Sequence, residues 1–126
     1  MPAFLTSLDV RIMADSGPRP RMMTLEPLHY QSEVIGTVVV PRFFAFDGAT
    51  IPRTAMGITG WPAVRAACIH DWLLSTDVRR QTADAVFGEA LAVCGVNQGT
   101  AELMLAAVML YTAMIEPRPP EERITA

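Results

Sequence analysis

Two helical patterns joined by a short polar turn constrain the fold of this chain more than any other feature. An apolar run covers residues 66–74, a second periodic run covers residues 80–94, and Ser75-Thr76-Asp77 separates them. If the helices fold back antiparallel about residue 77, positions equally distant from the turn face each other. His70 and Asp84 each lie seven residues from it. The spacing therefore predicts a helical hairpin with an imidazole and a carboxylate at one level.

This pair of side chains is typical of general-base catalysis. A carboxylate that holds one ring nitrogen fixes the tautomer and raises the basicity of the other nitrogen. Asp71 points about 100° away from His70 on a helix, so we expect Asp84 to orient the ring and Asp71 to bind a cation. The alternative interpretation is a core histidine bonded to a backbone carbonyl, with Asp84 in a surface ion pair with Arg80.

The composition is that of one globular domain. The chain has 126 residues, of which 51% are hydrophobic and 18% charged, the balance of a folded protein. Its net charge of −3, without a basic run, argues against nucleic acid as a partner. The apolar segment Leu103–Ile115 would span about 20 Å as a helix, against about 30 Å for a bilayer core. We therefore expect no transmembrane helix, and the N-terminal pattern predicts no secretion by a signal peptide.

The two cysteines fall inside predicted helices. In the hairpin, Cys94 lies about 12 Å along the second helix from the level of Cys68. A disulfide cannot bridge that gap, so we expect two buried thiols.

The N-terminal third favours strands. Leu8, Val10 and Ile12 alternate with polar or longer residues, residues 22–30 form a second β-prone segment interrupted by Pro27, and residues 36–40 form a third. We expect an antiparallel β-meander of about three strands, with the following phenylalanines, 43, 44 and 46, in the core.

Three helices should follow. Proline at the first helical turn starts one at Trp61-Pro62, which ends near Leu74. Asp77 is the expected N-cap of the second helix, Gly95 its left-handed C-terminal residue, and Asn97 or Thr100 the cap of the third. The predicted fold is an α+β domain over residues 1–116, with a Pro-rich C-terminal arm over residues 117–126. The Leu103–Ile115 helix, apolar on two faces, is either central or half of a subunit contact.

The turn-rich segment 47–53 is a candidate cation site. Calcium prefers several oxygen ligands, and this loop could offer carbonyl oxygens and the carboxylate of Asp47 beside that of Asp71. The alternative is a structural turn in which Asp47 bonds its own backbone.

Three motifs follow one another along the chain. They are Val40-Pro41-x-x-Phe44-x-x-Asp47-Gly48-Ala49-Thr50-Ile51-Pro52, Ala66-Ala67-x-x-His70-Asp71-Trp72-Leu73 and Arg80-x-x-Ala83-Asp84-x-x-Phe87. Together they resemble a family of small phage and prophage proteins known as domain of unknown function 1353. The resemblance covers roughly residues 22–115 and implies a viral or prophage origin, without supplying an activity.

The His-Asp helix followed by Asp-x-x-Phe is also similar to the phospholipase A(2) plan. That resemblance implies His70 as general base, Asp84 as its orienting group and Asp71 as a calcium ligand. The chain departs from the plan because it lacks an evident glycine-rich calcium loop, and Leu74 stands where a tyrosine is common.

Three functions follow as hypotheses. The leading one is a phage-encoded, calcium-dependent, phospholipase-like ester hydrolase acting on a membrane lipid. The second is a non-catalytic virion or tail component, made in the host cytoplasm, which packs against virion subunits or its own copies through the Leu103–Ile115 helix. A metal-dependent phosphohydrolase ranks lowest, because its second histidine is missing from the helices.

Overall fold

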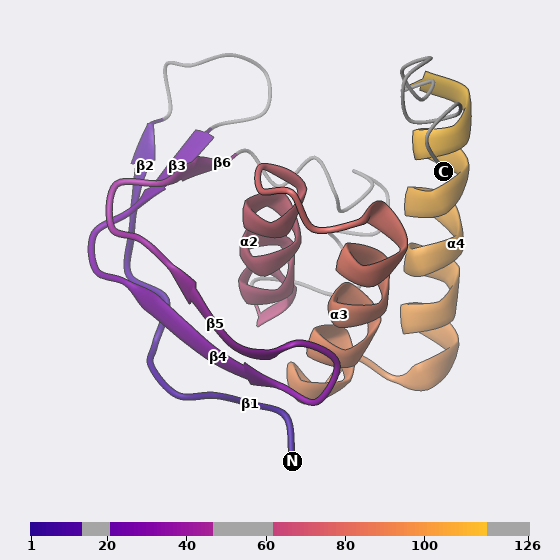
Figure 1. Cartoon of the computed structure of the whole chain (residues 1–126), viewed down its shortest axis with the longest axis horizontal. Coiled ribbons are helices and arrows are strands. Elements are labelled where there is room, and N and C mark those ends of the chain that lie inside the picture. The colour runs from indigo at the N-terminus through magenta and orange to yellow at the C-terminus, as the bar shows by residue number, and fades with distance from the viewer. Residues whose placement is uncertain (14–20, 47–61, 116–126) are drawn as a thin grey trace.

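The described residues form six short strands followed by three helices, which confirms the α+β class. A computed structural model describes residues 1–13, 21–46 and 62–115, with side chains as far as residue 110. The strands are β1 (Ala3–Phe4), β2 (Val10–Met13), β3 (Arg21–Thr24), β4 (Leu28–Ser32), β5 (Gly36–Val40) and β6 (Ala45–Phe46), and the helices are α2 (Pro62–Leu74), α3 (Arg80–Val93) and α4 (Gln98–Ile115). Figure 1 shows α2 between the strands and α3, with α4 on the outer side of α3.

The strands form two antiparallel sheets rather than one meander. Their orders are β1-β4-β5 and β2-β3-β6. The expected second strand, residues 22–30, divides at Pro27 into β3 and β4, which belong to different sheets, because proline cannot donate to a ladder. The expected pairing of residues 36–40 with the preceding strand is confirmed, with Tyr30 opposite Val38 and Gly36 at φ +85° in the turn.

A buried threonine holds the connection that leads into β6. The Thr24 hydroxyl donates to the carbonyl of Pro41 at 2.8 Å and accepts from the amide of Phe44 at 2.9 Å. The Thr24 carbonyl also accepts from the amide of Phe43 at 2.7 Å. These bonds hold Phe43 at φ +66° with 61% of its surface exposed, so the prediction that it belongs to the core is wrong.

The helix ends follow local chemistry, with one exception. Gly95 has φ +86°, and the amides of Gly95 and Val96 reach back to Ala92 and Leu91 in a Schellman arrangement. The Asn97 side chain accepts from the amide of Thr100 at 2.9 Å and begins α4.

The prediction of Asp77 as N-cap is wrong, because Arg79 precedes the first residue of α3. The hydroxyls of Ser75 and Thr76 donate to the carbonyls of Trp72 and Leu73 at the end of α2. The polar turn therefore closes the first helix, and the chain needs residues 77–79 to reverse direction.

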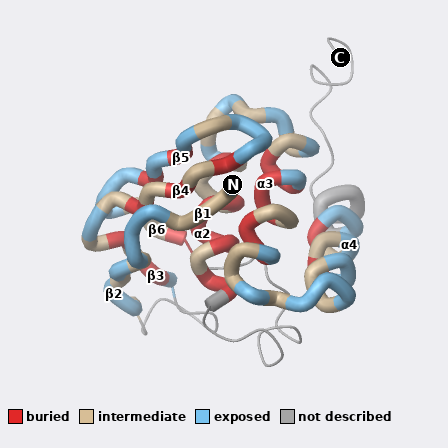
Figure 2. Tube along the Cα trace, turned by 90° about the horizontal axis from the view of Figure 1, so that it is seen from below, coloured by how far each residue is buried: buried red, intermediate tan, exposed pale blue. Residues whose placement is uncertain are grey.

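The core lies where α2 meets its neighbours. Seven residues of α2 from Ala63 to His70 are buried, and so are the apolar residues Ala83, Val86, Phe87, Ala90 and Leu91 of α3 (Figure 2). Cys68 is buried and Cys94 is half-buried, so the prediction of two buried thiols is correct for Cys68 alone; both are free cysteines. No helix in the described part of the chain is long and apolar enough to cross a membrane.

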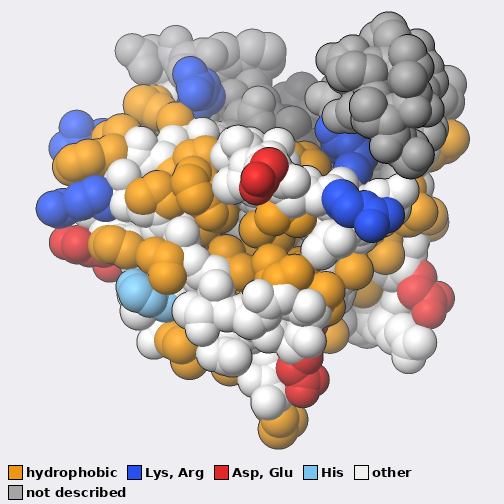
Figure 3. Space-filling view, viewed as in Figure 1, with side chains coloured by type: hydrophobic (Ala, Val, Ile, Leu, Met, Phe, Trp, Pro, Cys, Tyr) orange, Lys and Arg blue, Asp and Glu red, His pale blue; other side chains and the backbone are white. Residues whose placement is uncertain are grey.

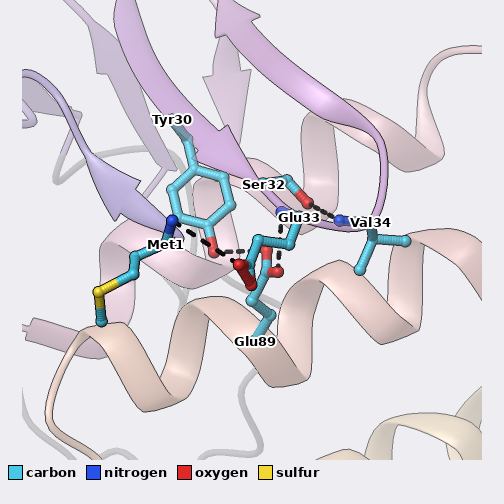
Figure 4. Close-up of polar contacts among 6 residues, drawn as sticks. All are labelled: Met1, Tyr30, Ser32, Glu33, Val34 and Glu89. Atoms are coloured by element: carbon cyan, nitrogen blue, oxygen red, sulfur yellow. Dashed lines mark hydrogen bonds and ion pairs between the residues drawn. The ribbon is translucent and has the colours of Figure 1, made fainter.

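One carboxylate ties the β4–β5 hairpin to α3 (Figure 4). Glu89 accepts from the Tyr30 hydroxyl at 2.7 Å through one oxygen and from the amide of Glu33 at 3.0 Å through the other. Glu33 in turn lies 3.6 Å from the amino group of Met1. These contacts fix the position of the β4–β5 hairpin along α3, the helix that carries Asp84.

Replacing Thr24 with valine should destabilise the fold by about 1–3 kcal/mol, because a buried carbonyl and an amide lose their partner while the shape is kept. The free energy of unfolding in urea measures the loss. Thr37→Val is the matched control, since the Thr37 hydroxyl is exposed and bonds Gln31 at 3.3 Å. Equal effects of the two substitutions would contradict this account of the connection.

Tyr30 should make stability fall at alkaline pH. Burial first, and then the bond to Glu89, raise the pKa of Tyr30 well above its ordinary value. The unfolded chain loses this proton from about pH 10 while the folded chain keeps it, so unfolding becomes easier by up to about 1.4 kcal/mol per pH unit. The chain has no lysine to mask the effect. The stability advantage of wild type over Tyr30→Phe should shrink between pH 9 and 11 on the order of this slope; a constant difference would contradict the assignment.

Candidate functional site

The hairpin brings His70 and Asp84 into direct contact. Nε2 of His70 lies 2.7 Å from Oδ1 of Asp84, so the facing positions deduced from the sequence meet in space. His70 lies on α2 and Asp84 on α3, and these helices pack along their length. The alternative interpretation of Asp84 as a surface residue is wrong, since Asp84 is 8% exposed.

Aromatic packing fixes the plane of the imidazole. The ring of Phe87 lies 4.9 Å from the ring of His70, centroid to centroid, at an interplanar angle of 40°. Phe87 follows Asp84 by three residues, so both side chains project from one face of α3. The motif Ala83-Asp84-x-x-Phe87 does not by itself assign Phe87 to the site, but its three-residue spacing from Asp84 is the signal that places it beside the ring.

The pair lies in an apolar setting. The His70 ring is 1% exposed, and the neighbouring residues of α2, from Ala66 to Ile69, are 0% exposed. A buried polar group is costly unless it is hydrogen-bonded. Each member of the pair therefore stabilises the burial of the other, and His70 makes a further interaction besides this one.

Asp71 takes a separate position. It is half-exposed, it has an interaction of its own, and its charge contributes to the raised pKa of Cys68, which burial causes in the main. The structure does not place it in the His70–Asp84 bond. The other predicted calcium ligand, Asp47, lies outside the described residues.

The acidic, histidine and cysteine side chains of the described residues do not form a calcium site. No three histidine, cysteine or acidic side chains converge within residues 1–13, 21–46 and 62–110. Calcium takes six to eight oxygens, and Asp71 alone does not supply them. The site that the described residues form is thus an oriented imidazole.

The sequence matches a family model across most of the fold. The model described as "Protein of unknown function (DUF1353)" matches residues 22–108. The chain belongs to the DUF1353 family. The matched segment begins in β3, ends in α4, and contains both His70 and Asp84. No curated protein and no solved structure matches this DUF1353 chain.

Removing the carboxylate should weaken the hairpin. Asp84→Ala deprives a buried imidazole of its partner, and we expect a loss of about 1–3 kcal/mol in the free energy of unfolding. Asp77→Ala is the control, because Asp77 is exposed in the turn between the same two helices. Chemical denaturation of both variants measures the difference, and an Asp84→Ala variant as stable as the control would contradict a structural role for the bond.

Proposed function

We propose that this DUF1353 protein is a phage-encoded ester hydrolase of phospholipase type that acts on a membrane lipid. The observation that carries the proposal is the 2.7 Å contact between Nε2 of His70 and Oδ1 of Asp84. A carboxylate at this distance sets the tautomer of the ring and stabilises the imidazolium that forms when the ring takes a proton.

In the proposed reaction the imidazole of His70, held by Asp84, takes a proton from water as the water oxygen attacks the ester carbonyl. The tetrahedral intermediate then expels the alkoxide, which receives that proton from the imidazolium. Asp84 holds the ring in place and acts as a positioning residue throughout.

Access to the ring is the demanding step. Because His70 is 1% exposed, the substrate or the lipid surface that holds it has to open a path to the imidazole. The apolar surroundings of the ring also strengthen the electrostatic effect of Asp84 on it. The proposal therefore predicts higher turnover on aggregated lipid than on a monomeric ester.

The proposal includes a requirement for calcium, which is tested by comparing hydrolysis with calcium and with chelator. Calcium bound near the ester would polarise the carbonyl oxygen. Asp71 is the one predicted ligand in the described part of the chain, so we derive no step through the ion.

A second candidate function is favoured by the outer face of α4. Leu103 and Leu110 are 69% and 61% exposed, which is typical of a surface that meets another chain. A non-catalytic virion or tail component would use this face against other subunits, and the His70–Asp84 pair would then serve stability alone. Stoichiometric presence in purified virions, together with an inert protein, would favour this candidate.

Hydrolysis of phospholipid micelles, followed by fatty-acid release with calcium and with chelator, tests the leading proposal. His70→Gln should reduce turnover by about 10²–10⁴-fold, the usual contribution of a general base. Asp84→Asn should reduce it by a smaller factor, because the ring stays in place but the imidazolium loses its counter-charge.

His29→Gln is the matched control, since His29 is the other histidine of the chain and lies in β4, away from Asp84 in the sheet. It should leave turnover unchanged. If folded wild type releases no fatty acid under either condition, or if His70→Gln is as active as wild type, the hydrolase proposal is wrong.

A further inference from the structure

The outer face of α4 carries a regular spacing of large and small residues. The helix rests on α3 through Met104 and Val108, which are 1% and 6% exposed. On the opposite side, Leu103, Ala106 and Leu110 are exposed. Their separations of three and four residues are those of a coiled-coil seam.

This face lies on the outside of the molecule. Figure 1 shows α4 at one edge of the fold, on the far side of α3 from the sheets, and Figure 3 shows hydrophobic side chains along the same edge. Between residues 98 and 110 the helix carries one charged residue, Glu102. A surface helix without a partner normally has a polar outer face.

We infer that α4 pairs antiparallel with α4 of a second copy of this chain, about a two-fold axis at the level of residue 108. In an antiparallel pair with this centre, position 106 faces position 110 of the partner, and position 110 faces position 106. Each level then places a leucine position opposite an alanine position. Layers of one large and one small residue have equal width, so the two helices can approach closely at these levels.

A parallel pair fits the same residues worse. Leucine would meet leucine and alanine would meet alanine, which gives alternating wide and narrow layers. The two Glu102 carboxylates would also lie at one level beside the seam and repel each other. In the antiparallel pair they are about 18 Å apart along the axis, beyond a Debye length at physiological salt, and the helix dipoles oppose favourably. Spacing and charge therefore both select the antiparallel two-fold pair.

Sedimentation equilibrium of the full chain tests the inference. Wild type should show a monomer–dimer equilibrium. Ala106→Glu and Leu110→Arg should each raise the dissociation constant about tenfold or more, because a charge enters the apolar seam without a partner. Thermal unfolding checks that each variant is folded. Val39→Glu, which adds a charge at a 42% exposed apolar residue of β5, should leave the dissociation constant unchanged.

The double variant A106E/L110R decides the orientation. In the antiparallel pair each glutamate faces one arginine of the partner, which gives two such pairs in the dimer, so dimerisation should return relative to the single variants. In a parallel pair the like charges would meet and the double variant would stay monomeric.

A monomeric double variant, a wild type that is monomeric at its highest soluble concentration, or a wild type that instead binds lipid vesicles through this face would each overturn the inference. The test measures association and not hydrolysis, so this inference and the proposed function can fail independently. A dimer without activity would contradict only the proposed function, and an active monomer would contradict only this inference.

Discussion

The hydrogen bond between His70 and Asp84 is the constraint on which the arrangement of the central helices depends. It joins two polar groups inside a region that is otherwise apolar. A shift of α3 by one residue would rotate Asp84 by about 100° and leave the buried imidazole without its carboxylate. Apolar packing tolerates small shifts, whereas this bond does not. The pair therefore sets the register of α3 against α2. The ring of Phe87 packs against the imidazole and helps to hold its plane.

Much of the helical half could be predicted because its signals are local. Pro62 at the start of α2, Gly95 after α3 and Asn97 before α4 act within one turn of their own position. The His70–Asp84 contact could be predicted because a short turn between two helices leaves few alternatives for which residues face each other. Asp77 was misplaced because Ser75 and Thr76 close α2 instead of opening α3.

The strand half was harder to predict because its pairings are long-range. Pro27 marks an interruption within residues 22–30, but nothing local shows that the two halves belong to different sheets. Their long-range partners decide it, because Thr24 pairs with Val10 and Leu28 pairs with Val40. Phe43 was expected in the core because aromatic residues usually are. Its exposure follows from the bonds of the Thr24 backbone and side chain, which hold Phe43 in the left-handed region.

The site and the family membership bear on function in different ways. DUF1353 membership places the chain among proteins of unknown function, whereas the oriented imidazole suggests what chemistry to look for. The deep burial of that imidazole makes access the property that separates an enzyme from a packing module. Association through the outer face of α4 is independent of the site, because the His70–Asp84 pair lies between α2 and α3 on the inner side of the helical layer.

A double-mutant cycle on the free energy of unfolding tests the central claim most directly. It compares wild type, His70→Gln, Asp84→Asn and the double variant under one set of conditions. The account predicts a coupling energy of about 1–3 kcal/mol between the two positions. Additive effects, with a coupling energy near zero, would contradict the claim that this bond holds the two helices in register.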